Sequence, residues 1–445
     1  MRTVTRWIGC TFGIVLALCV TAEEPPTGLL YSDERVQPGY TLVAPISSPT
    51  THLIDTQGAV VHSWESDAPA GNAAYLMENG NLLRTESVVP SGSRLFKQGG
   101  AGGRVRQFAP DGSIVWEFLL SDENGRLHHD VEILPNGNVL MIAWEAKSAA
   151  EAIAAGRNPD LLEDGELWPD RIIEVEPVRP SGGRIVWEWS VWDHLIQDHD
   201  TTKANYGDVA AHPELVDLNF VSGAGPADWN HTNSVAYNAE LDQIVLSVHE
   251  FNEIWIIDHS TTTEEAAGHT GGRCGKGGDL LYRWGNPRAY RAGTKADQIL
   301  YGQHDAQWIA EGLPGAGNVL LFNNGFNRPG EPCSAAAEIA PPLNADGTYG
   351  RRPGQPFGPA LPLWRYASAE IYSPNISGAQ RLANGNTLIC SGASGRLTEV
   401  TTDGAVVWIY VNPYAVHEGG KLHREVFKVR RYAPDHPGIR SLLET

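Results

Sequence analysis

The chain has 445 residues, with 33 Lys and Arg against 53 Asp and Glu, and a formal net charge of −20. A field of this sign repels nucleic acid and anionic membranes, which excludes a general role in binding either. Nothing in the sequence has the spacing of a metal finger, and after the N-terminal segment only Cys274, Cys333 and Cys390 remain.

Residues 1–22 have the features of a secretory signal peptide. Arg2 and Arg6 precede the apolar run "IGCTFGIVLALCV", and "VTA" stands directly before Glu23 as a cleavage site. No later stretch is apolar enough over enough residues to cross a membrane. We therefore expect an exported protein, periplasmic or secreted and without membrane insertion, whose residues 23–445 form one catalytic domain.

A five-residue pattern recurs six times after this segment. It consists of two apolar residues, an aromatic or His, any residue and an aromatic, and "IVWEF" and "VVWIY" are examples. The copies occupy residues 60–64, 114–118, 185–189, 280–284, 362–366 and 406–410. Because side chains alternate along a strand, both ring positions face the same side, as sheet packing requires.

A second repeat, built on an Asn-Gly turn, lies upstream in most units. "MENGNLL", "LPNGNVL" and "LANGNTL" each predict a hairpin between two short strands. Four strands per unit and six units predict an all-β fold, a six-bladed β-propeller with loop and short-helix insertions. The first unit lacks its opening strand, and we expect the C-terminal segment 424–432 to supply it and close the ring.

The insertions and cysteines give further expectations. Residues 146–157 and 211–218 are predicted to be short helices. The insertions 145–170 and 190–228 are predicted to wall the functional site, and loops on the outer surface are the alternative. Cys274 and Cys333 lie in long loops of neighbouring units, so we expect them to form a disulfide and Cys390 to stay buried and reduced. Three free thiols are the alternative.

Polar clusters head the first strand in three consecutive units. They are "LHHDVEIL" at 127–134, "NHTNSVAY" at 230–237 and "GQHDAQWI" at 302–309. The first strand of a propeller blade borders the central channel, so these side chains are predicted to converge at one channel mouth. They are His128, His129, Asp130, His231, Asn233, His304 and Asp305. Imidazoles can serve there as nucleophiles, bases or anion-stabilising cations.

These motifs together resemble those of the bacterial aryl-sulfate sulfotransferases that do not use 3′-phosphoadenylyl sulfate. The matching stretches are "GQHDAQWI…GNVLLFNNG", "DWNHTNSVAY" and "LHHDVEILPNGNVL", and the resemblance spans residues 40–432. It implies a periplasmic six-bladed propeller that moves a sulfuryl group from an aryl sulfate to a phenolic acceptor through a sulfo-histidine, with no cofactor and no metal in the site. By position it implies His304 as the nucleophile. It gives catalytic or sulfate-binding roles to His231, Asn233 and one of His128 and His129.

One position departs from the family pattern. The family has an arginine where this chain has His249, and an imidazole cannot clamp a sulfate bidentately as a guanidinium does. Arg328 or Arg396 could replace it. We therefore place Arg328, His249, Asp130 and Asp305 with Asn233 among the substrate-binding candidates.

Two other functions remain open at this point. A metal-dependent propeller hydrolase would use the histidines as ligands, which suit zinc. A non-catalytic binding propeller would need aromatic side chains at the channel mouth rather than His and Asp. The fold alone does not decide between these functions.

Overall fold

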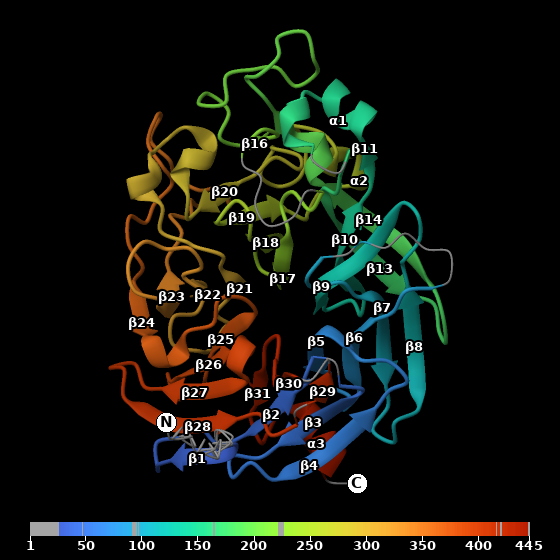
Figure 1. Ribbon diagram of the computed structural model, residues 1–445, viewed down its shortest axis with the longest axis vertical. Helices are drawn as coiled ribbons and strands as arrows, with labels where there is room; N and C mark the ends of the chain where they lie inside the picture. Colours follow the sequence, from blue (N-terminus) through green and yellow to red (C-terminus); the bar gives the residue numbers. More distant parts are fainter. Residues whose placement is uncertain are drawn as a thin grey trace, which may run out of the picture.

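The computed structural model describes residues 26–46, 48–90, 96, 98–162, 165–220, 227–414, 416–418 and 421–443. The predicted signal peptide, residues 1–22, lies outside this part of the chain. Six antiparallel sheets are arranged as blades around one axis (Figure 1). This confirms the predicted six-bladed β-propeller.

Blades 1 to 3 contain the strands that follow, each from the inner to the outer edge. Blade 1 is β31 (Arg430–Tyr432), β2 (Tyr40–Val43), β3 (Thr50–Ile54) and β4 (Val60–Glu65). Blade 2 is β5 (Ala70–Leu76), β6 (Leu82–Ser87), β7 (Gly103–Phe108) and β8 (Ile114–Leu119). Blade 3 is β9 (Gly125–Ile133), β10 (Val139–Glu145), β13 (Asp170–Pro177) and β14 (Gly183–Ser190).

Blades 4 to 6 complete the ring. Blade 4 is β17 (Thr232–Asn238), β18 (Gln243–Val248), β19 (Glu253–Asp258) and β20 (Tyr282–Trp284). Blade 5 is β21 (His304–Trp308), β22 (Val319–Asn323), β23 (Ser334–Ile339) and β24 (Trp364–Ser368). Blade 6 is β25 (Ser377–Arg381), β26 (Thr387–Ser391), β27 (Arg396–Val400), β28 (Val406–Val411) and β1 (Gly28–Ser32).

The five-residue repeat forms or leads into the outermost repeated strand of every blade, and its tryptophan links that blade to the next one. In each case the indole Nε1 donates a hydrogen bond to a backbone carbonyl in the connection before the outer strand of the following blade. The pairs are Trp64 to Ala109, Trp116 to Gly182, Trp189 to Gly278, Trp284 to Pro359, Trp364 to Thr402 and Trp408 to Thr56. The last pair joins blade 6 to blade 1, so the repeat itself runs around the closed ring.

The C-terminal strand closes the ring as predicted. β31 pairs antiparallel with β2, with Tyr432 opposite Tyr40, and becomes the inner strand of blade 1. The N-terminal strand β1 pairs with β28 on the outside of blade 6, which the sequence did not predict. Both ends of the chain therefore protect sheet edges.

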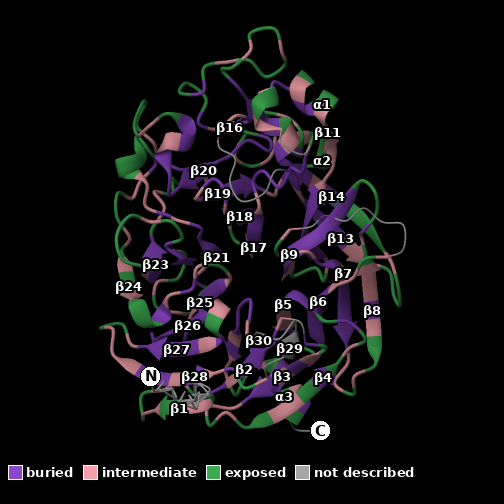
Figure 2. Cartoon of the chain, in the orientation of Figure 1, coloured by how far each residue is buried: buried purple, intermediate pink, exposed green. Residues whose placement is uncertain are grey.

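The insertion before blade 4 is packed against the propeller rather than loosely attached. Residues 211–218 were predicted to be helical, but they form turns and the short strand β16 (Val216–Asp217), which pairs with β15 (Leu195–Ile196). Val216 and Leu218 are fully buried, and the buried Arg283 of blade 4 donates to the carbonyl of Leu215. Apolar burial outweighs the local helical pattern in this segment. Across the ring, the inner strands of the blades are largely buried and exposed residues lie mainly in the outer loops (Figure 2).

Helices are few and short in the described chain. The helix predicted within 146–157 is α1 (Ala149–Ala154), and α2 (Thr263–Ala266) and α3 (Pro437–Leu443) are the other α-helices described. No helix in this part of the chain has the length and hydropathy that a bilayer span requires.

The predicted disulfide is wrong. Cys274 and Cys333 are free and half-buried, which agrees with the alternative of three free thiols. The backbone N–H of Cys274 donates to Asp258, and the Cys333 thiol contacts the carbonyl of Ser334. Cys390 is buried and reduced, as predicted.

Candidate active site

Four histidine rings form a continuous row across blades 3, 4 and 5. The ring centroids are 4.6 Å apart for His129 and His231, 5.3 Å for His231 and His249, and 5.6 Å for His249 and His304. His129 lies on β9, His231 directly precedes β17, His249 follows β18, and His304 begins β21. Residues far apart in the sequence therefore build one imidazole-lined site.

His304 has the protonation state that a nucleophile requires. Its Nδ1 lies 2.9 Å from Oδ1 of Asn324 and 3.1 Å from the carbonyl of Gly302, so Nδ1 carries the proton and Nε2 a lone pair. Burial, reinforced by His249, lowers the pKa of His304 to about 3. The ring is therefore neutral at physiological pH.

His231 is the cationic member of the row. Its Nδ1 is hydrogen-bonded to Asp228, whose second oxygen accepts from Trp144. Burial disfavours the charged ring, but the Asp228 carboxylate outweighs burial and raises the pKa of His231 to about 9. His231 thus contributes an imidazolium to the row, beside His129 and His249, where it can stabilise an anion.

The structure separates His128 from His129. His128 stacks on Trp144 at a centroid distance of 4.2 Å, and its side chain is fully buried. Its Nε2 contacts Asp170 at 3.1 Å, and its Nδ1 lies 2.8 Å from Nδ1 of His129. If Nε2 of His128 donates to Asp170, its Nδ1 accepts the His129 proton and leaves Nε2 of His129 bare. His129 is therefore the ring in the row, and His128 orients it from behind.

His249 occupies the position at which the family has an arginine. Its Nδ1 lies 2.7 Å from a Glu250 carboxylate oxygen, so this nitrogen donates and Nε2 is directed away from Glu250. Nε2 of His249 lies close to Gly302, because a Cβ atom placed on Gly302 would be 3.0 Å from this nitrogen. The same Cβ would be 3.2 Å from Cβ of Phe326. The replacement thus keeps a nitrogen donor or acceptor in the row but loses the fixed double donor.

Asn233 contacts the backbone next to His304. It is fully buried, and its Nδ2 donates to the carbonyl of Gln303, the residue before His304. Within the described residues its Oδ1 has no hydrogen-bond partner. The contact positions the backbone of the His304 strand.

Contacts between neighbouring blades correct the alignment of the three motifs. Asp130 accepts the backbone N–H of Val235, Ser234 accepts that of Ala306, and Asp305 accepts that of Ala379. Asp130, Ser234 and Asp305 are therefore equivalent, which makes His129, Asn233 and His304 equivalent too. When the three motifs are aligned as the strings "LHHDVEIL", "NHTNSVAY" and "GQHDAQWI", Asn233 stands opposite Asp130, one residue out of step.

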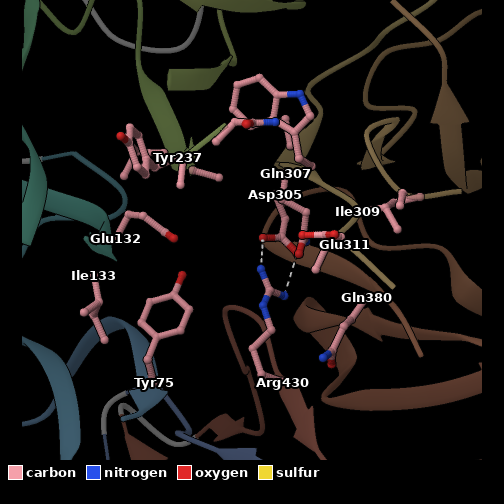
Figure 3. A pocket seen from close by; sticks show the side chains of 18 of the residues that line it. Tyr75, Glu132, Ile133, Tyr237, Asp305, Gln307, Ile309, Glu311, Gln380 and Arg430 are labelled. Carbon is pink, nitrogen blue, oxygen red and sulfur yellow. Dashed lines mark hydrogen bonds and ion pairs between the residues drawn. The ribbon is translucent and has the colours of Figure 1, made fainter. Parts of the chain in front are cut away.

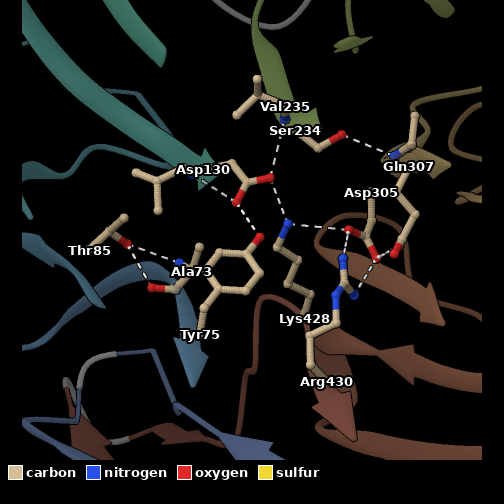
Figure 4. A network of polar contacts seen from close by, with 12 residues as sticks. Ala73, Tyr75, Thr85, Asp130, Ser234, Val235, Asp305, Gln307, Lys428 and Arg430 are labelled. Atoms are coloured by element: carbon tan, nitrogen blue, oxygen red, sulfur yellow. Dashed lines mark hydrogen bonds and ion pairs between the residues drawn. The ribbon is translucent and has the colours of Figure 1, made fainter. Parts of the chain in front are cut away.

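Asp130 and Asp305 are held by cations of the closing segment (Figure 4). Lys428 Nζ lies 2.6 Å from Asp130 and 3.2 Å from Asp305, and Arg430 binds Asp305 bidentately at 2.7 and 3.0 Å. Tyr75 donates to the other oxygen of Asp130 at 2.8 Å. The two carboxylates, predicted to bind substrate, thus pair with the segment that closes the ring.

Lys428 and Arg430 were missed by the sequence interpretation. The signal was present in "KVRRY", because two carboxylates facing a channel require buried cations nearby. Phe427, one residue earlier, packs under the row, with ring centroids 5.9 Å from His129 and 6.2 Å from His304. The closing segment therefore forms the floor of the histidine site.

The cavity beyond this floor has a volume of about 620 Å³ (Figure 3). It is lined by Tyr75, Glu132, Tyr237, Gln307 and Arg430 among others, and by none of the four histidines. Burial, with the charge of Asp130 adding, raises the pKa of Glu132 to about 8 despite Lys428 and Arg430. The row of four histidines is therefore a separate site from this cavity.

Arg328 lies in the loop after β22, half-buried, with its backbone N–H bonded to Gly325. None of the contacts of the four histidines given above involves it. Arg396 lies 3.9 Å from Glu370 and takes no part in these contacts either.

Six blades around a row of four imidazoles, one of them cationic, define a β-propeller with a site suited to anionic esters. The sequence profile described as Arylsulfotransferase (ASST) matches residues 30–340, more than half of the chain. The chain belongs to this family. Membership implies sulfotransferase activity in general, on small-molecule aryl sulfates and phenols.

No curated protein sequence matches the chain. A protein of unknown function from Bacteroides caccae is 12% identical, with a TM-score of 0.46, covering 89% of this chain and 99% of that one. Virginiamycin B lyase from Staphylococcus aureus is 10% identical, with a TM-score of 0.39, covering 87% and 88%. Both TM-scores are low, so these structures bear on neither the fold nor the function.

Proposed function

We propose that the protein transfers a sulfuryl group from an aryl sulfate to a phenol through a sulfo-histidine on His304. The observation that carries the proposal is the bare, neutral Nε2 of His304 in a row that also contains the His231 imidazolium. A neutral nucleophile attacks an anionic ester best where a fixed cation receives the charge.

The first half-reaction forms the N–S bond and breaks the bond from sulfur to the aryl oxygen. His304 Nε2 supplies the electron pair, and His231 gives its proton to the departing aryl oxide. In the second half-reaction the acceptor phenol returns a proton to His231 while its oxygen forms the new S–O bond and the N–S bond breaks. Proton and electron pair balance over the two steps.

His129 and His249 are suited to positioning. A phenol hydroxyl can donate a hydrogen bond to the bare Nε2 of His129, on the far side of His231 from His304. His249, held by Glu250, adjoins His304 and can contact a sulfuryl oxygen through Nε2. Holding donor and acceptor in line is a large part of what such a site supplies.

The test is turnover of 4-nitrophenyl sulfate with and without a phenol and with and without chelator. We expect release that depends on phenol and resists chelator, one sulfuryl group on wild-type protein by intact mass, and neither with His304→Ala. Chelator-sensitive hydrolysis would instead select a metal-dependent hydrolase. No release at all would leave a binding propeller.

We also infer that the protein is exported. The support is the arrangement of Arg2, Arg6, the apolar run and the "VTA" sequence before Glu23. Mass spectrometry of the protein recovered from cell fractions should give a mature N-terminus at Glu23 outside the cytoplasm. An intact Met1 in the cytoplasm contradicts export.

A further inference from the structure

A second cluster of chemically active side chains lies apart from the histidine row. It joins His194, at the end of the 3-10 helix η2 (Val191–His194) after blade 3, to His269 and Asp279 in the β19–β20 connection of blade 4. One ligand atom from each residue lies within 4.8 Å of the other two. His194 and Asp279 are buried, and His269 is exposed.

Both histidines direct Nδ1 at the same carboxylate oxygen. Nδ1 of His194 lies 2.9 Å, and Nδ1 of His269 2.7 Å, from Oδ1 of Asp279. In a tetrahedral site with metal–nitrogen distances of about 2.0–2.1 Å, ligand atoms lie roughly 3.3 Å apart. A small outward shift of each side chain would therefore admit a metal ion.

The second nitrogen of His194 supports this interpretation. Nε2 lies 2.8 Å from the carbonyl of Ala266, so it carries a proton and donates it. Nδ1 is then the ring nitrogen left to bind a cation, and it already faces the Asp279 carboxylate. Metal-bound histidines commonly donate their other ring N–H to a carbonyl in this way.

The surroundings hold His194 and Asp279 in place. The ring of His194 stacks on Trp189 at an interplanar angle of 8°, and Trp189 in turn donates to the carbonyl of Gly278. A Cβ on Gly278 would lie 2.0 Å from the carbonyl oxygen of Ala266 and 2.6 Å from Nε2 of His194, so only glycine fits beside the cluster. The loop that carries His269 is closed by backbone bonds from Gly277 to Gly271 and from Gly278 to Gly268.

We propose that His194, His269 and Asp279 bind a divalent zinc-type ion that ties blade 3 to blade 4. Two imidazole nitrogens and one carboxylate oxygen suit zinc better than calcium or magnesium, which prefer oxygen ligands. With three protein ligands and His269 at the surface, water completes the coordination. The site is structural in position and independent of the proposed sulfuryl transfer.

The test measures zinc bound to protein that has first been freed of metal by chelator and dialysis. Wild type should bind one zinc ion that His269→Ala loses, with an affinity at least about 100-fold weaker in the variant. Because His269 is exposed, this change leaves the buried packing intact. Zinc should also raise the melting temperature of wild type and not that of the variant.

Two matched variants exclude other sources of zinc. His212→Ala removes an exposed histidine that contacts Glu214 at 2.9 Å and belongs to no group of three metal-type ligands among the described residues. This variant should bind zinc as wild type does. His304→Ala removes a histidine of the row and should keep the same zinc ion. The proposal is overturned if wild type takes up no more zinc than His269→Ala, which would mean that a proton joins His194 and Asp279. It is also overturned if the zinc ion is lost in His304→Ala rather than in His269→Ala. Metal content does not depend on turnover, so this result and that for sulfuryl transfer are separable.

Discussion

Nδ1 of His304 donates to Oδ1 of Asn324 across 2.9 Å, and this contact, together with that to the Gly302 carbonyl, fixes which nitrogen of the ring is free to react. Asn324 is itself held by the carbonyl of Ser373 and the hydroxyl of Ser377. The tautomer of the proposed nucleophile thus depends on residues of blades 5 and 6 together.

Changing Asn324 to Asp should make kcat/KM decline at acidic pH. His304 has a pKa of about 3, so wild-type kcat/KM should show no loss attributable to His304 on lowering the pH to about 5. A carboxylate beside the ring raises its pKa by about 1–3 units, so Asn324→Asp should lose rate in mildly acidic buffer. The pH–rate profile measures this.

Asn323→Asp is the matched control, because Asn323 contacts Tyr301 and Ile299 instead of His304. Its profile should keep the wild-type shape. Identical acid limbs in both variants would show that Asn324 does not set the protonation of His304.

Changing Asp228 to Asn should move the alkaline limb of activity downward. The pKa of His231 is raised to about 9, so its imidazolium persists below that pH and is lost as the pH rises through it. Without the carboxylate, burial dominates and the pKa falls below its ordinary value, so activity at pH 8 should fall at least about 10-fold in kcat. Glu214→Gln, at the exposed His212 pair, should leave the limb unchanged. If the loss of activity at alkaline pH occurs at the same pH in Asp228→Asn as in wild type, His231 does not take part in the proton transfer.

Changing Lys428 to Met should destabilise the closed ring strongly. Lys428 is 6% exposed and its ammonium lies between Asp130 and Asp305, so removing it leaves the buried Asp130 carboxylate without a cation. The expected cost is about 3 kcal/mol in the free energy of unfolding, measured by denaturant titration. Arg184→Met, which breaks the exposed pair with Glu176, should cost under about 1 kcal/mol. Equal costs would mean that Lys428 contributes little to ring closure.

Changing Glu132 to Gln should flatten the dependence of stability on pH. The pKa of Glu132 is about 8 in the fold against an ordinary 4.5, so the folded protein holds a proton that the unfolded chain has lost. Wild-type stability should therefore fall as the pH rises from 4.5 to 8, by at most about 1.4 kcal/mol per pH unit from this group. Unfolding curves between pH 5 and 8.5 should be less pH-dependent for Glu132→Gln. Glu311→Gln, an exposed residue of the same cavity, is the control, and parallel curves for all three proteins would contradict the assignment.

The repeated tryptophan of the outer strands shows how the sequence could predict the fold. The spacing of this tryptophan predicted six blades. In the structure its hydrogen bonds link every blade to the next, and the bond from Trp408 to Thr56 links blade 6 to blade 1. The closing strand within 424–432 was also predictable, because the first unit visibly lacked a strand. Such features follow from local strand and turn patterns, which each unit repeats independently.

The histidine clusters predicted the location of the site but not its internal order. The sequence made His128 and His129 equal candidates for the site. Only the stacking of His128 on Trp144 shows that His128 lies behind the row and His129 within it. The prediction of a helix in 211–218 was wrong, because the burial of Val216 and Leu218 outweighs the local helical pattern. Neighbouring residues on a bulged strand cannot be assigned to a face without the partner strand.

The charge pairing of the channel was decided by tertiary structure alone. Lys428 and Asp130 are 298 positions apart, and Asp305 reaches the same ammonium from another blade. The cluster of His194, His269 and Asp279 likewise forms only where two blades meet. The sequence determines the strands and turns, because these depend on near neighbours. Which charges meet depends on how the ring closes, since closure alone brings distant side chains within a few ångströms and excludes the water that would otherwise solvate them.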